Sequence, residues 1–181
     1  FNMSVIIKDN FFYGVYRAVS ATARLRSPDQ VSIIAIGKSK DGRDFFDREP
    51  FITPTEEWEK YGCEDPRVTY FEGNYYIFYT ALSEYPFNAN GIKVAVAVSK
   101  DLKKVSERHL ITPFNAKAMT LFPRRINGRI TVIVAVDTDK PPVKIAIAQV
   151  SDIGDLWNPL FWEEWYKNVD KHTIDLKRNQ Y

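Results

Sequence analysis

The feature that most constrains the fold is a hairpin-and-turn unit that occurs three times along the chain. In each unit, two runs rich in β-branched and aromatic residues are followed by a Ser-Lys-Asp or Ser-Asp element. These polar elements begin at Ser39, Ser99 and Ser151, about 50–60 residues apart. Units one and two also end alike, in Phe-Ile-Thr-Pro at 51–54 and Leu-Ile-Thr-Pro at 110–113. Repeats of this kind are typical of β-propeller blades, and an all-β sandwich with chance similarity is the alternative.

Strand composition dominates the chain, which carries 12 Phe, 10 Tyr and 4 Trp. Aromatic and β-branched residues favour sheets over helices. Strands are predicted at residues 11–19, 31–36, 75–81, 92–98, 130–136 and 143–150. Turn formers such as Asp-Gly and Asn-Gly separate these segments. The best helix candidate is short and spans residues 161–168, where aromatics recur three to four residues apart.

The number of repeats is small for a closed propeller. Each blade has about four strands, and closed rings have about 4–8 blades. Three units in 181 residues therefore predict a partial ring. We expect residues 1–181 to form a single propeller domain that is incomplete at its C-terminus. Either further residues or a second copy in a homo-oligomer would complete it.

Charge and cysteine content exclude several functions. The chain has 25 Lys plus Arg against 23 Asp plus Glu, and this even balance argues against a nucleic-acid partner. No apolar run approaches the roughly 18 residues of a membrane helix. Cys63 is the single cysteine, and His109 and His172 lack metal-ligand spacing, so no metal site is expected. The absence of a signal segment and the free thiol favour a cytoplasmic location.

The densest cluster of chemically useful side chains is Glu-Asp-Pro-Arg at residues 64–67. Pro66 biases Asp65 towards an extended conformation, in which neighbouring side chains point to opposite sides. We therefore expect Glu64 and Asp65 to occupy different pockets, with one of them facing a central channel. Arg67 would return to the side of Asp65 and pair with it or bind substrate oxygens. The alternative is a set of surface salt links of little energetic value.

Several short elements, in order along nearly the whole chain, resemble glycoside hydrolase family 130. These elements are Phe1-Asn2, Val15-Tyr16-Arg17-Ala18, Ser39-Lys40-Asp41-Gly42, Gly62-Cys63-Glu64-Asp65-Pro66-Arg67, Ser99-Lys100-Asp101-Leu102, Leu121-Phe122-Pro123 and Ile126-Asn127-Gly128. That family contains β-mannoside phosphorylases and β-mannosidases on a five-bladed propeller. The resemblance implies that this chain covers roughly three of the five blades.

The resemblance also implies roles for individual residues. Asp65 matches the family's general acid, which acts through a sugar hydroxyl rather than directly on the glycosidic oxygen. Arg67 and Glu64 of the same motif are expected to contact the substrate. Arg17 matches an arginine that lines the sugar pocket, and Asn2 matches an early asparagine facing the same pocket. A structural hydrogen bond is the alternative role for both Arg17 and Asn2.

The sequence departs from the family pattern at positions that bind phosphate in the family's phosphorylases. Family phosphorylases carry Asn-Lys-Asp ahead of Leu-Phe-Pro, and here only Lys117 of the three remains, between two alanines. A phosphate-binding arginine of the following strand falls near Ala135. Arg124 is a second phosphate candidate, with a solvated surface role as its alternative. Because a phosphate dianion needs several Lys or Arg donors, these losses favour hydrolysis slightly over phosphorolysis.

Hydrolysis with inversion requires a second carboxylate to activate water. Asp137 and Glu163 are candidates, as are residues of blades outside this sequence. An aromatic stripe of Phe161, Trp157, Trp162 and Trp165 would serve either sugar stacking or, more commonly, packing between blades.

The sequence thus predicts a glycosidase acting on β-linked mannosides or manno-oligosaccharides with inversion. It would work by hydrolysis, or by phosphorolysis that releases mannose 1-phosphate. No cofactor is expected, apart from inorganic phosphate as co-substrate in the second case. The alternative is a non-catalytic carbohydrate-binding propeller or an inactive fragment.

Overall fold

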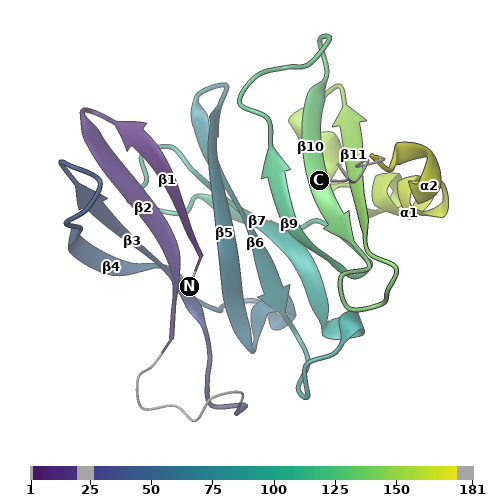
Figure 1. Ribbon diagram of the computed structural model, residues 1–181, viewed down its shortest axis with the longest axis horizontal. Coiled ribbons are helices and arrows are strands. Elements are labelled where there is room, and N and C mark those ends of the chain that lie inside the picture. The colour runs from purple at the N-terminus through teal and green to yellow at the C-terminus, as the bar shows by residue number, and fades with distance from the viewer. Residues whose placement is uncertain (1, 20–26, 175–181) are drawn as a thin grey trace, which may run out of the picture.

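Three antiparallel sheets, arranged side by side, make up the molecule (Figure 1). The computed structural model describes residues 2–19 and 27–174. The first sheet has the order β1 (Met3–Lys8), β2 (Phe11–Ala18), β3 (Ile33–Ser39) and β4 (Phe46–Ile52). The second has the order β5 (Gly62–Phe71), β6 (Asn74–Leu82), β7 (Ile92–Ser99) and β8 (Glu107–Leu110). The third has the order β9 (Ala116–Leu121), β10 (Ile130–Val136) and β11 (Lys144–Val150).

The predicted hairpins are the second and third strands of each sheet, which are β2–β3, β6–β7 and β10–β11. The repeat and the all-β class are therefore confirmed. The three sheets do not close a ring within the described residues (Figure 1).

The Ser-Lys-Asp elements are turn caps at the end of the third strand. The buried Ser39 hydroxyl accepts a hydrogen bond from the Gly42 N–H at 2.9 Å and donates to Asp41 at 2.8 Å. Ser99 and Asp101 repeat this arrangement at the end of β7. Backbone N–H groups donate to both aspartates and lower the pKa of each below its ordinary value. The first two sheets therefore make the same turn, whereas after the third sheet Asp152 caps η3 instead.

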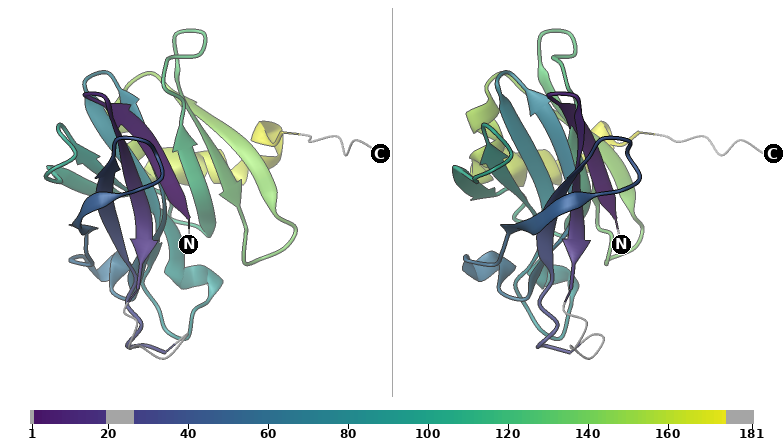
Figure 2. Two further views of the ribbon diagram at one scale, coloured as in Figure 1. Left: turned by 60° about the vertical axis from the view of Figure 1, so that its left-hand side comes forward. Right: turned by 90° about the vertical axis from the view of Figure 1, so that its left-hand side faces the viewer.

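Short helices complete the structure. η1 (Glu57–Glu59) precedes β5, and η2 (Ala89–Gly91) lies between β6 and β7. η3 (Ile153–Trp157), α1 (Pro159–Lys167) and α2 (Val169–His172) follow β11 and lie on the side of the third sheet away from the first (Figure 2). The predicted helix at 161–168 corresponds to α1. No helix among the described residues has the length and apolar character needed to cross a membrane.

The first strands β1, β5 and β9 were not among the predicted segments, yet they organise the molecule. β5 contacts both β1 and β9. Two contacts place the beginnings of all three strands at one end of the molecule. Gly62 forms a parallel β-bridge with Ser32, and the Asn115 side chain, just before β9, donates a hydrogen bond to the Ile92 carbonyl. This end lies at the bottom of Figure 1, and we call it the lower end.

Two hydrophobic clusters hold the sheets together. One joins the first and second sheets and includes Val15, Ile34 and Ile77. The other joins the second and third sheets and includes Phe78 and Trp162. Close packing on both sides of the second sheet gives the start of β5 a rigid base.

Candidate active site

A β-bulge shapes the start of β5. Glu64 lies opposite Thr80 and Arg67 lies opposite Phe78, so two residues of β5 face one residue of β6. Asp65, the first residue of the bulge, has a φ of +51°. Aspartate tolerates this left-handed conformation better than most residues do. Pro66, which has no N–H to donate, fits where the ladder is interrupted.

The bulge turns both acids of the motif towards one arginine. The Nη1 atom of Arg17, on β2, lies 3.1 Å from Glu64 Oε2 and 3.8 Å from Asp65 Oδ1. The prediction that the two acids occupy different pockets is wrong, because the bulge breaks the alternation on which it depended. Arg17 therefore holds two carboxylates at the boundary of the first and second sheets.

Glu64 is fixed on both of its oxygens. Its Oε1 atom accepts a hydrogen bond from the Ser32 hydroxyl at 3.1 Å, while Oε2 faces Arg17. Ser32 is itself buried, and its carbonyl accepts the Cys63 N–H at 2.9 Å. Gly62 makes this approach possible, since a Cβ at that position would collide with the Ser32 hydroxyl oxygen.

Asp65 differs from Glu64 in its hydrogen bonding. Its Oδ1 atom is buried and has no hydrogen-bond partner among the described residues. Buried polar atoms in folded proteins nearly always have a partner, so an exception needs an explanation. A carboxyl oxygen left open beside a guanidinium is suited to bind a hydroxyl group of a ligand.

The other residues of the predicted sugar site lie at the same end. The Asn2 carbonyl accepts the Arg17 N–H at 3.3 Å, and the Asn2 side chain is exposed. Arg67 donates to the Pro66 carbonyl at 3.0 Å and forms no ion pair with Asp65, so the first of its two predicted roles is not seen, and substrate binding stays a prediction. Its other N–H groups have no hydrogen-bond partner among the described residues. Phe1 lies outside the described residues.

A buried polar cluster lies beneath the bulge, and no pattern in the sequence predicted it. Glu59, in η1, is completely buried and pairs with Arg108 of β8. Its carboxylate also accepts the Tyr79 hydroxyl at 2.6 Å and lies 3.4 Å from the Cys63 sulfur. Burial raises the pKa of the Cys63 thiol and of the Tyr79 hydroxyl, which keeps both neutral. The cluster fixes the residue that directly precedes Glu64.

The third sheet repeats the bulge without the acid. The register jumps between Lys117, which lies opposite Ala135, and Thr120, which lies opposite Ile133. Ala118 has a φ of +50° and so holds the position that Asp65 has in the second sheet. The backbone geometry is the same, and the carboxyl group is absent.

Lys117 is engaged by an acid of its own sheet. Its Nζ atom lies 2.9 Å from Asp139 Oδ1, and Asn115 donates to Asp139 Oδ2 at 3.0 Å. Partial burial would raise the pKa of Asp139, but hydrogen bonds from Lys117, Asn115 and Thr138 outweigh it and lower that pKa. Lys117 is thus neutralised within the protein.

The remaining predicted residues lie elsewhere or have other partners. Arg124 is exposed in the turn after β9, at the opposite end of that strand from Lys117, so the two do not share a site. Asp137 accepts the Tyr166 hydroxyl at 2.7 Å, and burial together with this bond raises the pKa of Tyr166 to about 12. Glu163 is exposed on α1.

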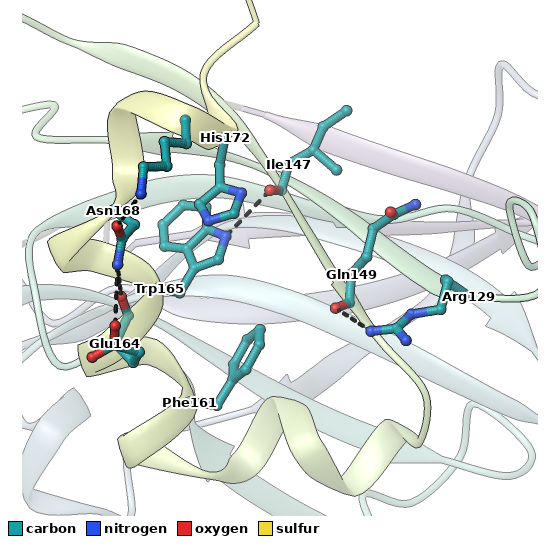
Figure 3. A pocket seen from close by; sticks show the side chains of 9 residues that line it. Arg129, Ile147, Gln149, Phe161, Glu164, Trp165, Asn168 and His172 are labelled. Atoms are coloured by element: carbon teal, nitrogen blue, oxygen red, sulfur yellow. Dashed lines mark hydrogen bonds between the residues drawn. The ribbon is translucent and has the colours of Figure 1, made fainter.

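Two of the hollows on the described surface have volumes of several hundred Å³. One of about 630 Å³ adjoins Arg17 and is also lined by Tyr16, Arg43, Phe45 and Arg48. The other, of about 920 Å³, lies between α1, α2 and β11 (Figure 3). Within residues 2–19 and 27–174, no group of three or more His, Cys, Asp or Glu side chains is arranged to hold a metal ion.

The aromatic stripe serves packing rather than sugar stacking. Trp162 is fully buried, and Trp165 is 5% exposed. Figure 3 shows the His172 ring stacked on Trp165. Their centroids are 5.3 Å apart, and those of His109 and Trp157, which also stack, are 4.6 Å apart. Within this stripe no broad indole face is therefore left for a sugar, although Trp165 and Phe161 border the larger hollow.

Curated relatives match part of the chain. A β-1,2-mannobiose phosphorylase of Listeria innocua is 31% identical over 126 residues, which cover 67% of this chain and 34% of the relative. A 1,2-β-oligomannan phosphorylase of a Thermoanaerobacter species is 28% identical over 134 residues, which cover 74% of this chain and 45% of the relative. The matched part of the chain thus spans between about a third and a half of these relatives.

A solved structure shares the fold. It belongs to a group of mannoside phosphorylases described as containing glycoside hydrolases that target β-1,2 mannosidic linkages in Candida mannan. It has a TM-score of 0.69 and 21% identity, and the match covers 87% of this chain and 47% of that one. The family model for glycoside hydrolase family 130, described as β-1,4-mannooligosaccharide phosphorylase, matches residues 1–164. This match takes in most of the sequence, and the chain belongs to glycoside hydrolase family 130.

Proposed function

We propose that this chain supplies the acid-bearing part of an enzyme that cleaves β-linked mannosides with inversion at the anomeric carbon. The observation that carries the proposal is the Oδ1 atom of Asp65, which is buried beside the Arg17–Glu64 ion pair and has no hydrogen-bond partner among the described residues. Family membership and the mannoside-specific relatives support the same substrate class. Both curated relatives act on β-1,2 linkages, so β-1,2-mannobiose is the first substrate to test.

In this mechanism Asp65 is the general acid. Its proton passes to a sugar hydroxyl, and the proton of that hydroxyl passes to the glycosidic oxygen as the bond to the anomeric carbon breaks. The nucleophile attacks the opposite face of the same carbon and inverts its configuration; if it is water, its proton passes to a second carboxylate that acts as general base. Arg17 holds Asp65 and Glu64 in place, while Arg67 and Asn2 bind sugar hydroxyls.

For the nucleophile, we favour water over phosphate. Lys117 is neutralised by Asp139, and its cross-strand neighbour is Ala135, which carries no charge. A phosphate dianion would have to displace Asp139 or find other cations. The relatives named as phosphorylases support the other outcome.

Product analysis with and without inorganic phosphate separates the two routes. Hydrolysis predicts mannose at an equal rate in both conditions. Mannose 1-phosphate that forms only with phosphate would establish phosphorolysis. Binding of mannosides without turnover in either condition would favour a carbohydrate-binding role.

We further propose that the three sheets are three blades of a five-bladed propeller. Support comes from the outer face of β1, where Met3, Val5 and Ile7 are 39%, 48% and 67% exposed. Apolar side chains in such a row are suited to pack against another sheet. If a further blade covers them in the whole protein, Ile7→Asp lowers its unfolding free energy by more than about 1 kcal/mol. A change within about 0.5 kcal/mol, as at an ordinary surface position, would contradict the proposal.

A further inference from the structure

A group of three aromatic side chains borders the lower end and is not used by the proposed mechanism. We call Tyr61, Tyr85 and Phe87 the aromatic rim. The ring centroids of Tyr61 and Tyr85 are 6.1 Å apart, and those of Tyr85 and Phe87 are 5.5 Å apart. Tyr85 is 40% exposed and Phe87 is 38% exposed. Unlike Trp162 and Trp165 of α1, the Tyr85 and Phe87 rings leave substantial surface to solvent.

The rim is built on the same strand pair as the candidate acid. Tyr61 directly precedes β5, and its N–H donates to the carbonyl of Leu82, the last residue of β6, at 2.8 Å. Tyr85 and Phe87 lie in the loop that leaves β6. Since Asp65 is four residues after Tyr61, the rim and the acid belong to one end of the second sheet.

The β6–β7 loop is held in one conformation. The Asn88 side chain donates to Glu84 at 2.7 Å and accepts the Asn90 N–H at 2.8 Å. Gly91 lies so close to Glu84 that an added Cβ would be 2.5 Å from the Glu84 Cβ. A loop constrained in this way presents its rings with little loss of entropy on binding.

Ring faces of this kind bind the apolar faces of pyranose sugars, while polar groups beside them bind hydroxyls. Glu84 and Asn90 flank the rim on the same loop, and the Lys60 Nζ atom lies 5.9 Å from the Tyr61 ring centroid. We propose that the aromatic rim is an oligosaccharide subsite, which binds sugar units beyond the pair cleaved at Asp65. This inference rests on the proposed function and adds a preference for longer substrates.

The test compares substrates of two lengths in the whole protein. The measured quantity is kcat/KM for a β-mannotetraose divided by kcat/KM for the matching mannobiose. We expect Tyr85→Ala and Phe87→Ala each to lower this ratio about threefold to tenfold, the equivalent of one lost aromatic contact. Tyr85→Trp, which keeps a ring, should retain most of the ratio. Calorimetric binding of both sugars to an Asp65→Asn variant gives a second readout that needs no turnover.

Tyr70→Ala is the matched control. Like Tyr85, Tyr70 is an exposed tyrosine, at 49%, and its ring centroid lies 4.8 Å from that of Tyr75. It belongs to β5 but lies at the end of that strand away from Asp65. This control should leave the ratio unchanged.

Several results would overturn the subsite. One is a ratio unchanged by both alanine variants, and another is equal binding of the two sugars by Asp65→Asn. A fall in melting temperature of more than about 4 °C in both alanine variants, with the ratio unchanged, would show a packing surface instead. Failure of wild-type protein to cleave mannobiose counts against the proposed function. The binding comparison would still decide whether the rim holds sugar.

Discussion

Arg17 of β2 and Glu64 of β5 form an ion pair with an N–O distance of 3.1 Å, and this pair joins the first and second sheets beside Asp65. The Ser32 hydroxyl holds the other oxygen of Glu64. Glu64 is thereby immobilised, and Asp65 is left with the unsatisfied oxygen. In the proposed mechanism, Glu64 supports the site and Asp65 is the general acid.

Replacing Arg17 by Met should lower kcat/KM for mannobiose about tenfold or more, because a charge-assisted contact to both acids is lost. Arg17→Lys should not restore activity, since one ammonium group does not reproduce a guanidinium held between two carboxylates. Arg125→Met removes an arginine from an exposed pair with Glu72 at the other end and serves as the control. Equal activities of the Arg17→Met and Arg125→Met variants would remove Arg17 from the site.

Gly62→Ala should both destabilise the protein and reduce its activity. The position has a φ of +144°, and a Cβ there would push against the Ser32 hydroxyl that holds Glu64. Gly73 has a φ of +89° and open space around it. Gly73→Ala therefore measures the cost of backbone strain without a side-chain collision. Urea denaturation should show a loss of at least about 1 kcal/mol for Gly62→Ala beyond that of Gly73→Ala. Losses of the same size would mean that contact with Ser32 has no effect.

Glu59→Gln should destabilise the protein by about 3–5 kcal/mol, the usual effect of breaking a buried ion pair. The change leaves the Arg108 guanidinium without its anion beneath the bulge. The matched control is Glu72→Gln, which breaks the exposed pair with Arg125 and should have no measurable effect. Similar stabilities of the two variants in denaturant would contradict the importance of the buried cluster.

Asp139 should stabilise the fold in a pH-dependent manner. Its pKa in the folded chain is below the ordinary value of 3.8, so its contribution is complete at pH values well above 3.8 and is lost as the pH falls below that value. Wild type should therefore be more stable than Asp139→Asn at pH 6, and the difference should shrink as the pH falls towards 3. A difference that stays constant over this range, measured by denaturant unfolding, would exclude the ion pair with Lys117 as its source.

The hairpins and turns of the fold can be predicted from the sequence. The β6–β7 hairpin is nearly uniformly buried, so its residues form unbroken apolar runs, and Ser39 and Ser99 mark where third strands end. The first strands are harder to recognise. β5 contains a proline and two acids, and the alternating burial of β1 leaves its apolar residues partly exposed.

The residues of the candidate site could be predicted from the sequence, but their spatial arrangement could not. The Glu-Asp-Pro-Arg motif pointed to Asp65 as the candidate acid, yet alternation wrongly separated Glu64 from Asp65, because a bulge depends on pairing with β6 that no local pattern encodes. The buried partner of Arg108 had no signal, since Glu59 lies in a polar segment resembling a surface loop. Asp139 was missed because its contact with Lys117 joins the turn after β10 to strand β9, which lies 22 residues earlier in the sequence.

The most direct test of the account is the turnover of β-1,2-mannobiose by wild type and by Asp65→Asn, with sugar binding measured in parallel. Loss of a general acid should lower kcat by about 10²–10⁴-fold, while the amide, close in shape to the carboxyl group, should preserve folding and mannobiose binding. The account predicts that outcome, with mannose or mannose 1-phosphate formed by wild type alone. An Asp65→Asn protein that binds and cleaves mannobiose at the wild-type rate would contradict it.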